Sequence, residues 1–162
     1  MLYLVLKLVH VGAVVMFLGN ITTGVFWKRH ADRTRDARLI ANAMDGIIRS
    51  DRLFTIPGVV LIVAAGIATA IRGHLPLLRT GWIFWALVLF TISGWAFMAK
   101  LAPIQRKLLA VASDGVSGAD PKWWERYEAL SRGWDVWGAI ALILPLLAMV
   151  LMVLKPALPA VP

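Results

Sequence analysis

Four long apolar stretches, separated by polar segments, constrain the fold of this chain more than any other feature of its sequence. Each is close to the roughly 20 residues of helix that cross a hydrocarbon core of ~30 Å. Their apolar residues are continuous, whereas the strands of a membrane barrel alternate apolar and polar residues. The chain is 60% hydrophobic and only 16% charged, outside the usual range for soluble domains. The sequence therefore predicts an all-α fold, an integral membrane four-helix bundle forming one domain, 1–162, with spans at about 2–27, 53–71, 81–99 and 134–154.

The lysines and arginines predict which side of the membrane each polar segment occupies, because basic residues cross the membrane poorly during insertion. Thirteen of them lie in segments 28–52 and 100–133, whereas the remaining segments hold three, or four with Lys7. We therefore expect both long segments in the cytoplasm and both termini on the outer, periplasmic side of a bacterial inner membrane. This topology, with contacts to anionic lipid, accounts for the net charge of +8 better than nucleic-acid binding does.

Segment 28–52 contains apolar residues at helical spacing, with polar residues on the opposite face. The apolar set is Leu39, Ile40, Ala43, Met44, Ile47 and Ile48. The pattern predicts a cytoplasmic amphipathic helix between the first two spans. We favour a position in the lipid headgroup layer over a docking surface for a partner protein, since such helices bury their apolar face at that boundary.

Several polar or proline residues interrupt the predicted spans. Asn20 and Thr22 are expected to form interhelical hydrogen bonds, and Ser50 or Asp51 to cap the second span. Pro57 and Pro145 each remove a backbone donor, which either kinks the helix or opens room for a ligand. A kink without function is the commoner outcome.

His10 is the histidine placed well inside a span, since His30 and His74 lie in polar segments. An imidazole in lipid requires a polar partner, and two interpretations are open: a functional ligand, or a neutral histidine donating to an oxygen of a neighbouring helix. With an outer N-terminus, His10 lies roughly 12 Å below the outer end of its helix. The fourth span brings Met149 to a similar depth, so His10 and Met149 are candidate ligands of haem, and His10 of a metal such as copper.

No nucleophile elbow, phosphate loop, paired-carboxylate site or HExxH motif is present, so hydrolytic and phosphoryl-transfer chemistry have little support and no catalytic residue is assigned. The absence of cysteine excludes disulfides and thiolate ligands. Redox chemistry and ligand binding remain.

The stretch from Leu6 to Val15, LKLVHVGAVV, resembles the first helix of the four-helix membrane protoporphyrinogen oxidase family. Ile56-Pro57-Gly58, Gly81-Trp82 and the segment from Leu101 to Leu108 follow the same plan. More similar still is the bacterial family called domain of unknown function 2269, described as predicted integral membrane proteins. The oxidase resemblance implies haem b bound partly through His10, but Ala86 stands where that family has a lysine, which removes a proposed catalytic position.

Three functions follow from these residues. The first is a haem-binding or redox-associated membrane protein using His10. The second is a non-catalytic component that packs with a membrane partner or forms a homo-oligomer through small-residue faces that include Gly12 and Gly19. The third is the handling of copper or another metal, suggested by His10 with Met149 and by a distant similarity to copper-resistance membrane proteins.

Overall fold

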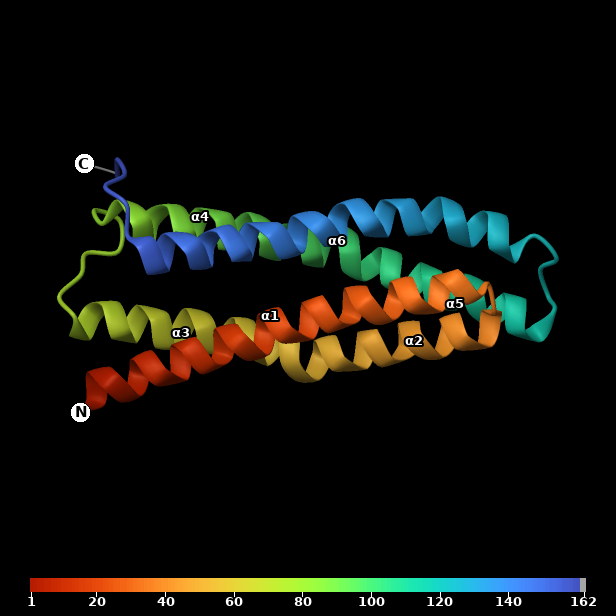
Figure 1. The fold of residues 1–162 in the computed structure, drawn as a ribbon, viewed down its shortest axis with the longest axis horizontal. Helices are drawn as coiled ribbons and strands as arrows, with labels where there is room; N and C mark the ends of the chain where they lie inside the picture. Colours follow the sequence, from red (N-terminus) through yellow and green to blue (C-terminus); the bar gives the residue numbers. More distant parts are fainter. Residues whose placement is uncertain (161–162) are drawn as a thin grey trace.

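The computed structural model describes residues 1–160 and consists of long helices joined by short connections (Figure 1). Within residues 1–160, six α-helices and two π-helical turns form four rods. The first rod is α1 (Leu2–Thr34), and the last is α6 (Trp123–Leu154). The second rod is α2 (Ala37–Ser50), η1 (Asp51–Thr55) and α3 (Ile56–Arg72), and the third is α4 (Gly81–Ala96), η2 (Phe97–Leu101) and α5 (Ala102–Ser117).

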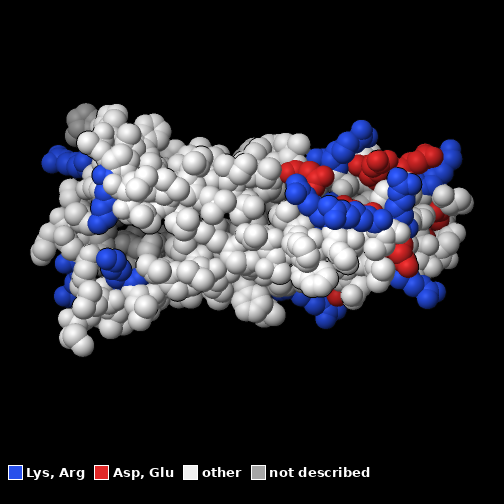
Figure 2. Space-filling view, in the orientation of Figure 1, with Lys and Arg blue, Asp and Glu red and all other residues white. Residues whose placement is uncertain are grey.

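Each rod is long and apolar enough to cross a membrane, which confirms the all-α, four-helix membrane fold. Figure 2 shows the charged side chains gathered over one half of the molecule, with a nearly uncharged band beside it and a few basic residues at the far end. We call the part formed by α2, α5 and the adjoining parts of α1 and α6 the charged half. The chain begins and ends at the opposite end of the molecule, on different sides of it (Figure 1), as an even number of spans requires. The periplasmic location of that end stays a prediction.

Prolines explain why the two middle rods contain π-helical turns. A proline ring clashes with the carbonyl four residues earlier and cannot donate to it, so the preceding turn widens. Pro57 and Pro103 are each the second residue of the helix that follows such a turn. In these turns the N–H of Ile56 donates to the Asp51 carbonyl and the N–H of Ala102 to the Phe97 carbonyl.

Pro145, inside α6, is accommodated differently. Its missing N–H leaves the carbonyl of Ala141 without its usual helical donor. The hydroxyl of Ser93 in α4 donates to that carbonyl at 2.9 Å, and both residues are buried. The proline thus produces a specific interhelical hydrogen bond between α4 and α6.

The predicted amphipathic helix is α2, but it does not occupy the place we favoured in the headgroup layer. It continues directly into η1 and α3 and runs beside α1 and α5 (Figure 1). Much of its apolar face is covered by protein: Ile40 and Met44 are fully buried in the core of the charged half, whereas Leu39 is 51% exposed.

The rods pair differently in the two halves of the molecule. Away from the charged half, α1 packs on α3 and α4 packs on α6, while α3 and α4 do not pack closely anywhere in residues 1–160. The rings of Phe17 and Phe90, 5.6 Å apart, connect the two pairs. In the charged half, α5 joins α2 to α6. The bundle is therefore held together mainly at that end.

Candidate functional site

His10 in α1 contacts α3 through a defined hydrogen bond. Its Nδ1 lies 2.9 Å from the carbonyl oxygen of Ile62. Because a carbonyl only accepts, Nδ1 carries the hydrogen, and Nε2 is the nitrogen that has a lone pair in the neutral form of the ring. The ring also rests against Gly66, where an added Cβ would lie only 3.0 Å from ring atoms. The histidine therefore makes the interhelical hydrogen bond that its position in a span predicts, and it still has one nitrogen free to act as a ligand.

Met149, the other predicted ligand, lies in the α4–α6 pair and is 39% exposed. His10 belongs to the α1–α3 pair, and the two pairs pack against each other mainly in the charged half. The structure thus does not bring His10 and Met149 into one packed site. Among residues 1–160 there is also no group of three or more His, Asp or Glu side chains that could hold a metal ion.

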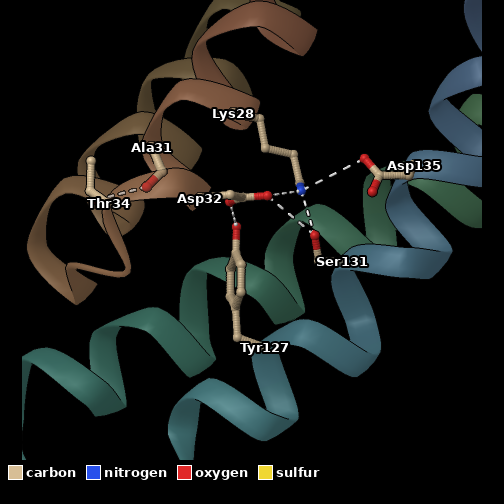
Figure 3. A network of polar contacts seen from close by, with 7 residues as sticks. All are labelled: Lys28, Ala31, Asp32, Thr34, Tyr127, Ser131 and Asp135. Atoms are coloured by element: carbon tan, nitrogen blue, oxygen red, sulfur yellow. Dashed lines mark hydrogen bonds and ion pairs between the residues drawn. The ribbon is translucent and has the colours of Figure 1, made fainter.

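A second polar group, which we call the Lys28 network, joins α1 to α6 in the charged half (Figure 3). Lys28 is 1% exposed, and its ammonium donates to Asp32 and to Ser131, both at 2.6 Å. Asp135 lies 3.9 Å away on its other side. The ammonium therefore has two carboxylates and a hydroxyl as partners, which is the pairing that burial of a charge requires.

Asp32 of this network accepts further hydrogen bonds. Asp32 accepts from the hydroxyl of Tyr127 at 2.6 Å and from Ser131 at 3.3 Å. Tyr127 precedes the apolar part of α6, and burial together with its bond to Asp32 raises the pKa of the phenol above its ordinary value. Lys28 also lies 4.8 Å from the ring centroid of Trp134, a cation–π contact. The phenol of Tyr127 stays protonated and donates to Asp32, which also accepts from Lys28 and Ser131. This network is therefore a rigid connection between α1 and α6.

A third polar group, the Asp51 cluster, lies where η1 meets α1 and α5. Oδ1 of Asp51 accepts from Asn20 at 3.2 Å and from Thr55 at 2.7 Å, and Oδ2 accepts from Gln105 at 3.0 Å. The amide of Asn20 also donates to the Thr55 hydroxyl at 2.9 Å. Asp51 is 7% exposed. All of its partners are uncharged, so the cluster contains one buried acid and no compensating base.

Two hollows lie on either side of this cluster. One is a groove of about 540 Å³ between α1 and α2, lined in part by Asn20, Gly24, Gly46 and Ser50. The other is a mostly apolar pocket of about 320 Å³ among α1, α3 and α4, and Thr55 is one of its lining residues. The pocket occupies the region where α3 and α4 do not pack closely.

The two clusters were not predicted from the sequence. The basic-residue pattern relates Lys28 only to topology, and the sequence predicts Ser50 or Asp51 as a cap of the second span, whereas the chain continues through Asp51 as a π-helical turn. Asn20 does form the expected interhelical bonds, but Thr22 donates to Leu18 of its own helix. A usable signal existed in α6, where Tyr127, Ser131 and Asp135 recur every four residues and thus share one helix face.

Comparison with known proteins gives a family but no characterised relative. The model of the family described as predicted integral membrane protein, domain of unknown function 2269, matches residues 4–156. No curated protein and no solved structure matches the chain. The similarity to the protoporphyrinogen oxidase and copper-resistance families thus gains no support from these comparisons. With almost its whole length matched, the chain belongs to the domain of unknown function 2269 family of predicted integral membrane proteins.

Proposed function

We propose that this membrane protein binds haem b and that His10 would hold the group through its imidazole. The observation that carries the proposal is the hydrogen bond between Nδ1 of His10 and the carbonyl of Ile62. A carbonyl that holds Nδ1–H fixes the tautomer and the ring orientation, and it leaves Nε2 as the ligating atom. Iron-bound histidines in proteins are commonly oriented in this way.

The surroundings of His10 are also compatible with a flat, apolar ligand. His10, Ala13 and Phe17 recur at helical spacing and so share one face of α1. Phe17 contacts Phe90 of α4 across the bundle. The face that carries His10 packs on α3, and Phe17 reaches from this face to α4. Bound at His10, haem b would supply reversible one-electron chemistry at its iron.

No second residue is assigned to hold the haem. Met149 is the candidate named from the sequence, but it is 39% exposed and lies in the other helix pair. We therefore propose His10 alone as a ligand and treat Met149 as a position to be tested. The arrangement gives no comparable support for copper handling, since no cluster of three ligating side chains occurs in the part of the chain that the structure describes.

The experiment is an optical titration of the purified protein with haem in mild detergent. The wild-type protein is expected to give a Soret band that saturates at one haem per chain, and His10→Ala is expected to lose it. His30→Ala is the matched control, because His30 lies exposed on the same helix, beside Phe26. A Met149→Leu variant reports on the second ligand through a change in band position.

Two results would remove the proposal. The first is the absence of a Soret band in wild-type protein that elutes as a single species. The second is a band of equal intensity in the wild-type and His10→Ala proteins.

We propose self-association in the membrane as a second candidate function, with a second copy of the chain as the partner. Gly12 and Gly19 lie two turns apart on α1, and an added Cβ at either would meet nothing within 4 Å. Such small, uncovered residues allow helices to approach closely in lipid. Crosslinking in vesicles is expected to give dimers in the wild type and monomers in Gly19→Leu; wild-type protein that stays monomeric would contradict this candidate.

A further inference from the structure

Asp51 is a buried acid whose charge is not balanced by a base. No lysine, arginine or histidine in residues 1–160 lies within ion-pair distance of its carboxyl group, in contrast to Asp32 with Lys28. An isolated charge removed from water is costly, and a buried carboxyl group without a cation avoids this cost by taking up a proton. In membrane proteins such groups commonly mark proton or ion pathways.

The charged residues on the neighbouring elements do not face Asp51. Arg49 and Arg52 on its own rod are exposed, and Arg49 pairs with Asp45. Lys100 and Arg106, on the rod that carries Gln105, are exposed as well. On α1, the nearest buried base is Lys28, which is bound to Asp32 and Ser131. The groups that do contact Asp51 are therefore two amides and a hydroxyl.

These three partners can satisfy both the ionised and the neutral carboxyl group. In the observed arrangement they donate three hydrogen bonds to the two oxygens. If Oδ2 carries a proton, the Gln105 amide can turn over so that its oxygen accepts from the acid, because an amide offers a donor and an acceptor at similar positions. A salt bridge at this place would fix the charged form, whereas amides allow the charge to change.

Residues next to Asp51 line an open groove on one side of the cluster. Asn20 donates a hydrogen bond to Asp51, and Ser50 directly precedes Asp51 in the chain. Both residues line the groove between α1 and α2. Thr55, on the other side, lines the apolar pocket. Asp51 thus has a neighbour or bonded partner in the wall of each hollow.

We propose that Asp51 is a proton-binding site, with a carboxyl group that is neutral at neutral pH and exchanges its proton with water in the α1–α2 groove. On release, the O–H bond of the acid breaks, the carboxylate keeps the electron pair, and a groove water takes the proton. The three side-chain donors then stabilise the carboxylate. The site does not depend on haem binding at His10.

Infrared spectroscopy of the full-length protein in lipid vesicles tests this proposal. At neutral pH the wild type is expected to show the C=O stretch of a protonated carboxyl group, and Asp51→Asn is expected to lack it. The matched control is Asp45→Asn in the adjoining helix, because Asp45 is half-exposed and paired with Arg49; this variant should keep the band. The band should vanish reversibly at high pH and be the same in potassium and sodium buffers.

A second variant tests the same proposal without removing the acid. Gln105→Leu deletes a donor that favours the ionised form, so the pH at which the band disappears should rise. Three results would each overturn the proposal: no protonated band in the wild type at neutral pH, a band that persists in Asp51→Asn, or a band that sodium removes at constant pH. The last result would make Asp51 a sodium ligand.

Discussion

Replacing Lys28 with methionine tests whether the buried ion pair stabilises the charged half. Methionine keeps the apolar length of the side chain but removes the ammonium, so Asp32 loses its shortest cationic contact, of 2.6 Å. Removing one partner of a buried pair costs roughly 3–5 kcal/mol, because the other charge is left uncompensated. Asp32 is 22% exposed and keeps its bonds from Tyr127 and Ser131, so we expect a loss near the lower end, about 3 kcal/mol.

The assay is reversible unfolding in mixed micelles of sodium dodecyl sulfate and a mild detergent, followed by tryptophan fluorescence. Arg49→Met is the matched control, because it removes a basic residue from an ion pair whose arginine is 73% exposed. Exposed pairs contribute about 0–1 kcal/mol. The reasoning is refuted if Lys28→Met loses no more stability than Arg49→Met does.

A double variant separates the charge effect from packing. If the loss in Lys28→Met arises from the unpaired carboxylate, adding Asp32→Asn should restore part of the stability, since no buried charge then remains. A purely steric effect of the methionine predicts no recovery. Equal stabilities of the single and double variants would therefore show that the charge of Asp32 is not the cause.

Two further substitutions test how helices contact each other in the membrane. Ser93→Ala should lower the free energy of unfolding by about 1–2 kcal/mol in the same assay, because the Ala141 carbonyl, left free by Pro145, loses its donor. This loss should be much smaller in a Pro145→Ala background. An unchanged loss would contradict the assignment of this hydrogen bond. Gly66→Ala should displace the ring of His10, which lies 3.0 Å from the added Cβ, and so weaken haem binding several-fold in the haem titration. Gly12→Ala is the control: an added Cβ there meets nothing within 4 Å, so haem binding should be unchanged.

The sequence by itself determined the class of fold. Four continuous apolar stretches have few alternatives, since only helices and closed barrels satisfy their backbone polar groups in lipid. The periodicity of the segment around Met44 likewise predicted an amphipathic helix correctly. Both inferences rest on properties of a single segment, its length and its hydrophobic period, which do not depend on what the segment packs against.

The tertiary structure decided which polar residues act together. Lys28 and Ser131 are separated by 103 positions, and Asp51 and Gln105 by 54, so no local pattern pairs them. The place of α2 was also decided by packing, because its apolar face suits a lipid surface and the side of α5 equally well. The i,i+4 spacing of Lys28 and Asp32 is local, but only the assembled bundle shows that Ser131 and Asp135 also surround Lys28 and that Asp51 has no basic partner. These surroundings are supplied by helices distant in sequence.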